Sequence, residues 1–186
     1  MTESRVMTTI RPAVSEDAAA IARVYVDSWR STYAGLVPDH VLVKMSFRRQ
    51  AESWSRFMRL KGRWDVVAVA EDAAVIGFGT AGPARGTTLP YRGEVYTLYL
   101  LQDYQGLGIG KALLRTLFAS LIERGMDSAL VWVLIQNPAR YFYRWVGGTQ
   151  IAERKHRLWG ADVSEVAFGW PELKRVVAPG GPCSVP

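Results

Sequence analysis

A glycine-rich stretch has the composition of a phosphate-binding loop: Gln105-Gly106-Leu107-Gly108-Ile109-Gly110-Lys111. It follows the apolar run 95–101 and precedes the helical apolar pattern of residues 113–122, so we expect it to connect a strand to a helix. At a helix N-terminus, free backbone N–H groups and the helix dipole attract anions, and glycines let the backbone approach a phosphate closely. The stretch therefore predicts a phosphate site at the start of this helix.

Two common nucleotide-binding motifs do not fit this spacing. A Rossmann fingerprint needs a third glycine where this chain has Lys111 or Leu113, depending on which pair of glycines is aligned. A Walker A loop needs a glycine where this chain has Gln105, and a serine or threonine where it has Ala112. Both motifs are excluded.

The spacing matches the pattern Gln/Arg-x-x-Gly-x-Gly/Ala, read as Gln105, Gly108 and Gly110. In this the stretch resembles the acyl-coenzyme A pyrophosphate loop of the GNAT superfamily of N-acetyltransferases. Taken alone, the loop leaves open a glycine-rich turn that binds no ligand. A second motif is therefore needed.

Such a motif follows the apolar run 129–134. GNAT members commonly carry a helix of the form Asn-x-x-Ala-x-x-Phe-Tyr-x-x-x-Gly-Phe, and residues 137–148 read Asn-Pro-Ala-Arg-Tyr-Phe-Tyr-Arg-Trp-Val-Gly-Gly. Four residues fall in register: Ala139, Phe142, Tyr143 and Gly147. Asn137 lies one residue closer to the Phe-Tyr pair than in the usual pattern, and Gly148 replaces the final Phe. Together the two motifs indicate acyl-CoA binding.

The resemblance implies a set of residues that bind acetyl-CoA as cosubstrate. They are Leu98, Tyr99, Leu100, Gln105, Gly106, Leu107, Gly108, Ile109, Gly110, Lys111, Asn137 and Tyr143. In the family the strand before the loop splays from its neighbour, which would leave the N–H of Leu98 for the thioester carbonyl and the backbone of Leu100 for the pantetheine arm. Lys111 either reaches a phosphate or points to solvent.

Two side chains are candidates for proton transfer. Tyr143 matches the position of a general acid near the coenzyme sulfur; the alternative is an aromatic residue in a packed helix. Glu94 lies eleven residues before Gln105, close to where histone-acetylating members carry a strand glutamate that acts as general base. Glu94 would act directly or through water, and the alternative is an ordinary charged residue at a strand edge.

Three aromatic residues, Trp29, Tyr33 and Tyr91, are candidates for contact with the acceptor. By resemblance, Trp29 and Tyr33 belong to the helical region that borders the acceptor cleft, and Tyr91 to a loop that does so. An aromatic stripe at a spacing of four is also typical of a core. The implied acceptor is a primary amine of a small molecule, peptide or protein, and the sequence does not separate these.

Composition narrows the other classes of function. The single cysteine, Cys183, excludes an internal disulfide and a cysteine-based metal site, and we expect no bound metal. A net charge of +6 would suit nucleic acid, but the charges are scattered and no nucleic-acid motif accompanies the densest cluster, residues 154–157, so nucleic acid is not the expected partner. No apolar run of membrane-spanning length and no signal-peptide core is present, so we expect a cytoplasmic protein that does not bind membranes. The oligomeric state stays open, a homodimer included.

The order of expected elements is that of the GNAT fold. We predict one α/β (α+β) domain over residues 8–170, with a GNAT-type mixed, mostly antiparallel central sheet flanked by helices, and a helix over residues 38–58 interrupted near Ser46. Residues 171–186 lack a periodic apolar face and are expected to form a flexible C-terminal tail. The main functional alternative is a catalytically idle acyl-CoA sensor, against which the presence of both Glu94 and Tyr143 argues.

Overall fold

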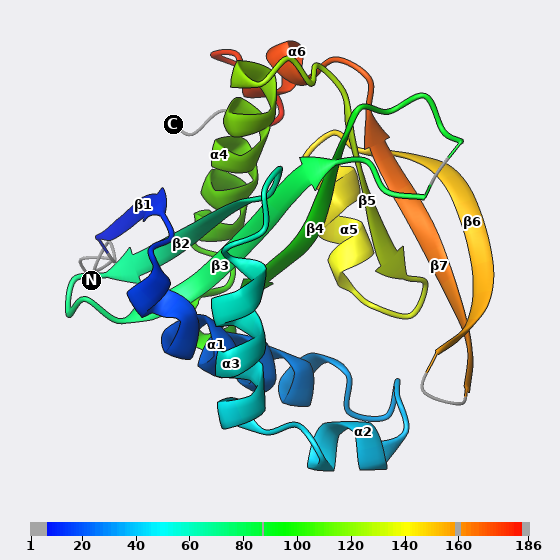
Figure 1. The fold of residues 1–186 in the computed structure, drawn as a ribbon. Helices are drawn as coiled ribbons and strands as arrows, with labels where there is room; N and C mark the ends of the chain where they lie inside the picture. The colour runs from blue at the N-terminus through cyan, green and yellow to red at the C-terminus, as the bar shows by residue number, and fades with distance from the viewer. Residues whose placement is uncertain (1–6, 87, 159–160, 184–186) are drawn as a thin grey trace, which may run out of the picture.

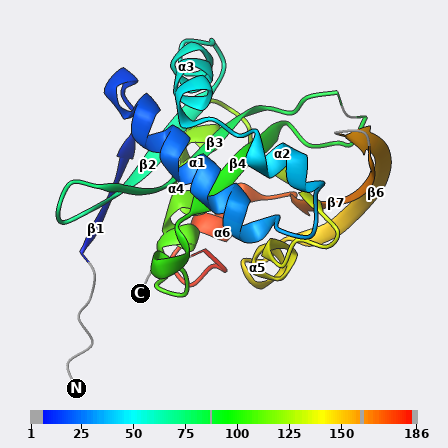
Figure 2. The ribbon, with the colours of Figure 1, turned by 90° about the horizontal axis from the view of Figure 1, so that it is seen from below.

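The computed structural model describes residues 7–86, 88–158 and 161–183, which form a seven-stranded sheet between two layers of helices (Figure 1). The strands are β1 (Thr8–Pro12), β2 (Trp64–Ala70), β3 (Val75–Pro83), β4 (Gly93–Leu100), β5 (Ala129–Leu134), β6 (Thr149–Leu158) and β7 (Ala161–Trp170). Their order is β1-β2-β3-β4-β5-β7-β6, and β4 and β5 are the parallel pair in an otherwise antiparallel sheet. Figure 2 shows the curved strands β6 and β7 at the sheet edge opposite β1. The predicted fold class is confirmed.

The helices also follow the predicted order. They are α1 (Ala18–Thr32), α2 (Asp39–Val43), α3 (Phe47–Phe57), α4 (Ile109–Glu123), α5 (Ala139–Trp145) and α6 (Leu173–Val177), with short 3₁₀ turns at Ser15–Asp17 and Gln102–Tyr104. The predicted interruption near Ser46 is present, because α2 ends before it and the Ser46 hydroxyl accepts the Arg49 N–H at 3.4 Å to cap α3. None of the described helices has the length and apolar character needed to cross a bilayer.

Each face of the sheet is covered by its own helices. On one face, α1 and α3 bury Ile21 and Trp54 against Val67 and Phe78 of the sheet. On the other face, α4 packs its apolar side against the sheet, and a Cβ on Gly79 of β3 would lie 2.7 Å from Leu117 of α4. The missing side chain therefore lets α4 approach the strands closely, which fixes the N-terminus of α4 relative to β4.

The two parallel strands separate along their length. Gly93–Val95 of β4 pair with Ala129–Val131 of β5, and no further pairing joins the described residues of these strands. β4 nevertheless stays paired with β3 as far as Leu100, with a register shift that leaves Tyr96 as the extra residue of a β-bulge. The C-terminal half of β4 is thus left without a partner on its β5 side.

The segment after β7 packs against α4. Leu173 and Cys183 are fully buried and Val176 is 8% exposed, and all three belong to the same core cluster as the apolar side of α4. The Leu173 N–H donates to the carbonyl of Asp127 at 2.8 Å. The expectation of a tail without a core-forming face is therefore wrong for residues 173–183, because a five-residue helix is too short for its two buried positions to show a periodic pattern. Residues 184–186 lie outside the described part, and the domain boundary at residue 170 stays a prediction.

Candidate active site

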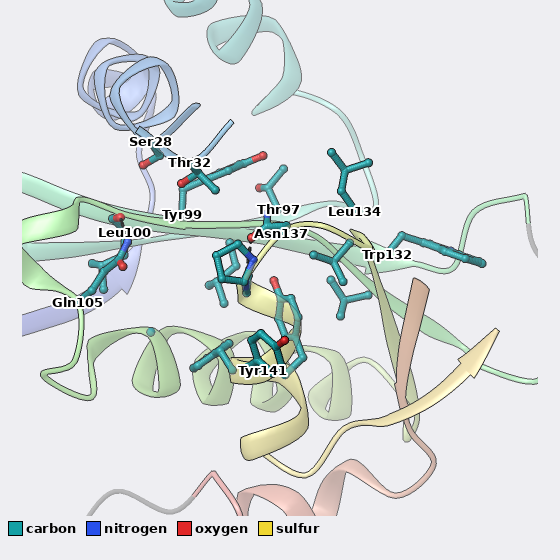
Figure 3. A pocket seen from close by; sticks show the side chains of 18 of the residues that line it. Ser28, Thr32, Thr97, Tyr99, Leu100, Gln105, Trp132, Leu134, Asn137 and Tyr141 are labelled. Carbon is teal, nitrogen blue, oxygen red and sulfur yellow. Dashed lines mark hydrogen bonds between the residues drawn. The ribbon is translucent and has the colours of Figure 1, made fainter. Parts of the chain in front are cut away.

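A cavity of about 840 Å³ opens where β4 and β5 separate. Figure 3 shows Ser28 and Thr32 of α1 on one side of β4 and Tyr141 of α5 on the other, with Gln105 at one end and Trp132 of β5 at the opposite end. The cavity therefore runs through the opening in the sheet and reaches both faces. Its volume suits a ligand of coenzyme size.

One end of the cavity is formed by the N-terminus of α4. Ala112 makes the first intrahelical bond, to the carbonyl of Gly108 at 3.0 Å, so the N–H groups of Ile109, Gly110 and Lys111 have no acceptor within the helix. Gly108 precedes the helix with φ of +80°, a conformation that favours glycine. These donors and the helix dipole suit an anion.

The glycine loop also leaves room for a ligand. A Cβ added at Gly106 or Gly108 would meet no atom within 4 Å. Of the predicted loop residues, five line the cavity: Gln105, Gly106, Gly108, Gly110 and Lys111. Leu107 and Ile109 do not line it, because the Leu107 side chain is exposed and that of Ile109 is buried in the core. Their backbones still shape the loop, and the residues present fit a pyrophosphate group.

The unpaired side of β4 presents backbone donors to the cavity. The Leu101 N–H donates to the carbonyl of Ile76 in β3 at 2.9 Å. Because N–H groups alternate in direction along an antiparallel strand, the N–H of Tyr99 also points toward β3, and those of Leu98 and Leu100 point the opposite way. Leu98 and Leu100 both line the cavity. The Leu98 N–H is therefore a fixed donor inside it, as the predicted thioester contact requires.

A buried tyrosine of α5, Tyr143, also belongs to the site. It lines the cavity, is 5% exposed, and its ring packs against those of Phe142, Phe168 and Trp170. Burial, with a smaller contribution from Tyr33, raises the pKa of the Tyr143 hydroxyl well above its usual range. Tyr143 is thus both packed and in the cavity, and its role as general acid stays a prediction. The phenol is protonated at neutral pH, as a phenol with its ordinary pKa also is.

The wall formed by α1 is tied to β4 and α5 by hydrogen bonds. Trp29 Nε1 donates to the Tyr99 hydroxyl at 2.9 Å, and Asn137 Nδ2 donates to the Tyr33 hydroxyl at 3.0 Å. Asn137 Oδ1 accepts the Ala139 N–H at 2.9 Å, at the start of α5. Trp29, Tyr33, Tyr99 and Asn137 all line the cavity, and their predicted contacts with acceptor and coenzyme stay predictions. Asn137, which lies one residue away from its usual place in the family pattern, thus holds Tyr33 and the start of α5 in position.

Two other predicted residues lie outside the cavity lining. Glu94 is 5% exposed and accepts hydrogen bonds from the Arg85 N–H at 2.9 Å and from Arg85 Nη2 at 2.8 Å. The Arg85 guanidinium also lies over the Tyr96 ring, 3.8 Å from its centroid. Tyr91 lies against Gly169 of β7, where a Cβ would come within 2.5 Å of Tyr91 Cζ. The structure does not bring Glu94 or Tyr91 together with Tyr143 and the glycine loop.

Several lining residues were not predicted as site residues, and two of them are Glu165 and Trp132. Glu165 of β7 and Trp132 of β5 line the cavity at the end away from the glycine loop. No local motif marks either residue, because the strand register alone places Glu165 beside Leu134 of β5. Among the residues that the structure describes, no group of three or more histidine, cysteine, aspartate or glutamate side chains is arranged to hold a metal ion.

Comparison with known proteins gives one consistent family. Residues 21–147 match the acetyltransferase (GNAT) family. An uncharacterized N-acetyltransferase, YuaI of Bacillus subtilis, is 38% identical over 167 residues, which are 90% of this chain and 95% of YuaI. The [ribosomal protein bS18]-alanine N-acetyltransferase of Haemophilus influenzae is 29% identical over 54% of this chain and 61% of its own.

Solved structures share the fold. The PaiA N-acetyltransferase of Thermoplasma acidophilum, solved in complex with coenzyme A, superposes with a TM-score of 0.62 at 22% identity and covers 86% of this chain and 98% of its own. At this level of identity the likeness concerns the fold.

Proposed function

The chain belongs to the acetyltransferase (GNAT) family and is an N-acetyltransferase, and we propose that its cavity passes the acetyl group of acetyl-CoA directly to a primary amine of a small molecule or peptide. The observation that carries the proposal is the separation of β4 from β5, which puts the Leu98 N–H, the α4 N-terminus and Tyr143 around one cavity. A site for binding alone would need no proton donor beside the strand opening. The proposed compartment is the cytoplasm, where a lone cysteine stays reduced.

The glycine loop would hold the coenzyme by its pyrophosphate. Gln105, Gly106, Gly108, Gly110 and Lys111 line this end of the cavity, and the N–H groups at the start of α4 face no internal acceptor. When bound there, acetyl-CoA supplies an activated thioester. Lys111 adds a positive charge at the same end, with its Nζ 5.1 Å from the centre of the Trp145 ring.

The Leu98 N–H would stabilise the negative charge that develops on the thioester oxygen. It belongs to a strand held by β3, so little reorganisation is needed when the charge forms. Loss of one such donor typically reduces transition-state stabilisation by about 2.7–4 kcal/mol. Because this donor is backbone, its contribution is independent of the leucine side chain.

Tyr143 would donate a proton to the departing thiolate. Its hydroxyl is buried in the cavity wall, and the phenol carries its proton at neutral pH, so the proton is present when the thiolate charge develops. We assign Glu94 no direct contact with the acceptor, because its carboxylate is bound by Arg85 and Glu94 does not line the cavity. The acceptor ammonium can instead lose its proton through water.

The test is acetyl transfer by Tyr143→Phe. This change keeps the ring and its packing, so coenzyme affinity and melting temperature should stay the same, whereas single-turnover acetyl transfer to an amine should fall by about 10²- to 10⁴-fold. Tyr91→Phe removes a hydroxyl outside the cavity lining and is the matched control, with an unchanged rate expected.

The measurement is free thiol released by a panel of primary amines and short peptides, at equal coenzyme occupancy. Equal rates for Tyr143→Phe and the unaltered protein would remove Tyr143 from the mechanism. Coenzyme binding without thiol release from any amine would contradict the proposed reaction as a whole. A peptide arm is included because the Haemophilus influenzae relative is named for an alanine of a ribosomal protein.

A further inference from the structure

We propose that Glu165 binds the ammonium group of the acceptor, and that the acceptor is a primary monoamine on an apolar stem. This inference rests on the acetyl transfer proposed above. It assigns a residue that lies some seventy positions from Glu94 in the sequence, on a different strand.

The strand register aims Glu165 at the cavity. Glu165 of β7 is paired with Leu134 of β5, so the two side chains stand on the same face of the sheet, and both line the cavity. The neighbour of Glu165 on β6 is Arg154, whose Nη2 lies 2.6 Å and whose Nε lies 2.7 Å from Oε2. His156 Nδ1 is 3.8 Å from the same oxygen. The hydrogen bond from Arg154 goes to Oε2, and none to Oε1 is found among the described residues, so Glu165 retains an acceptor for a ligand.

The charges of the cavity lie at opposite ends. Of the described residues that line it, two carry a charge at neutral pH, namely Lys111 at the glycine loop and Glu165 on β7. The positive end suits the phosphates of the coenzyme, and at the other end the Glu165 carboxylate, which Arg154 engages through Oε2, remains for the second substrate. A primary amine is a cation before it reacts, so the carboxylate is complementary to the form of the acceptor that first enters.

The charge of Glu165 also lies near the reacting groups. Burial is the main cause that raises the pKa of the Tyr33 hydroxyl; hydrogen bonding lowers it, and the charge of Glu165 raises it further. Burial also raises the pKa of Tyr143, with a smaller contribution from Tyr33. Tyr33 therefore lies within electrostatic range of both Glu165 and the proposed acid, and all three residues line the cavity. An ammonium group held by Glu165 would thus lie in the same cavity as Tyr143, within electrostatic range of Tyr33.

The surroundings of Glu165 are otherwise apolar and aromatic. Leu134 belongs to a buried cluster with Trp29 and Tyr33, and the Trp132 ring is covered by the Arg154 guanidinium, 4.0 Å from the ring centroid. With one carboxylate in the described lining, a second ammonium group on the acceptor would be desolvated without a partner, which is unfavourable. The lining thus favours a monoamine with an apolar stem over a polyamine.

The experiment compares Glu165→Gln with the unaltered protein, using phenethylamine, spermidine and aniline as acceptors. Glu165→Gln should raise the KM for phenethylamine by about 10-fold or more, the effect of losing a hydrogen bond to a charged group. The KM for aniline should stay the same, because aniline is uncharged at pH 7 and makes no ion pair. Coenzyme affinity should also be unchanged. Glu153→Gln, on the exposed side of β6, is the matched control.

The variant Arg154→Gln tests whether the Glu165 carboxylate itself or its ion pair with Arg154 is responsible for the effect on KM. It breaks the same bridge but leaves Glu165 in place, so the KM for phenethylamine should fall or stay within about twofold. A rise as large as that of Glu165→Gln would show that the bridge, not the carboxylate, matters, and would overturn the inference. An equal KM for phenethylamine in Glu165→Gln and the unaltered protein would also overturn it, as would a higher kcat/KM for spermidine than for phenethylamine.

Calorimetry tests amine binding by Glu165 separately from the proposed acetyl transfer. The Kd of phenethylamine is measured with the coenzyme A-loaded protein, so it can be compared between variants even where no acetyl transfer is seen. A Kd that rises about 10-fold or more in Glu165→Gln supports the inference whatever the outcome of the thiol assay. An unchanged Kd contradicts it, whereas missing thiol release with every amine contradicts only the reaction.

Discussion

Replacing Leu173 with alanine should destabilise the protein, although the sequence predicts a flexible tail there. The Leu173 side chain is fully buried in the cluster formed by the apolar side of α4, and its N–H is bonded to Asp127. Removing a buried leucine side chain typically lowers the free energy of unfolding by about 2–5 kcal/mol, with the larger values where the surroundings cannot collapse. Packing against α4, which the sheet holds on its other side, resists such collapse, so we expect at least about 3 kcal/mol.

The assay is urea unfolding together with a thermal melt. A loss of 3 kcal/mol should lower the melting temperature by about 6–12 °C for a domain of this size, and the m-value should stay the same if only the native packing changes. Lys174→Ala, at an exposed position of the same helix, is the control and should change the free energy of unfolding by less than about 0.5 kcal/mol. Equal stability of Leu173→Ala and Lys174→Ala would refute the docking of residues 173–183.

Three further changes test other parts of the structure. Gly108→Glu should abolish acetyl-CoA binding in calorimetry, because it puts a side chain and a negative charge beside the α4 N-terminus at a φ of +80°; retained affinity would contradict the phosphate site. Glu94→Gln should lower the free energy of unfolding by about 1–3 kcal/mol through its weaker bonds to Arg85, with acetyl transfer within about threefold; a loss of turnover confined to low pH would instead identify Glu94 as a base. Burial raises the pKa of the Cys183 thiol to about 11 from an ordinary 9.0, so the folded state keeps its proton while the unfolded state loses it, and stability present below pH 9 should be lost as pH rises toward 11. Cys183→Ala should remove up to about 1.4 kcal/mol per pH unit from that slope, and an unchanged slope would count against this cause.

The parts of the site that were predictable are those encoded in adjacent residues. The glycine loop is recognisable because one segment supplies the turn, the helix start and the free N–H groups, and Gly108 takes the expected place before α4. Ser46 likewise caps α3 from within its own turn. Such features depend on the backbone conformation of a few neighbours, which residue type constrains directly.

The parts that were not predictable depend on contacts between distant segments. Glu94 has the right distance from Gln105, but the role of its carboxylate is decided by Arg85, which stands in a loop without a recognisable pattern. Glu165 enters the cavity because of the register between β5 and β7, and a shift of one residue would turn it to the other face of the sheet. The residue types do not determine that register. Glu94 could therefore be proposed from its position in the family pattern, whereas Glu165 could not be found from the sequence.

The separation of β4 from β5 is the feature on which both halves of the site depend. A strand inside a sheet normally pairs all of its N–H groups, and a buried donor left without a partner is destabilising by about 1–3 kcal/mol. β4 leaves the N–H groups of Leu98 and Leu100 without a strand partner in the middle of the sheet, while β3 holds its other side in place. The cavity lets water or a ligand meet these donors, so the arrangement is tolerable only because it is open. The same opening would give the proposed coenzyme a path from the α4 face to the face where Glu165 and Trp132 stand. Pairing the two strands to their ends would satisfy the backbone and close the site.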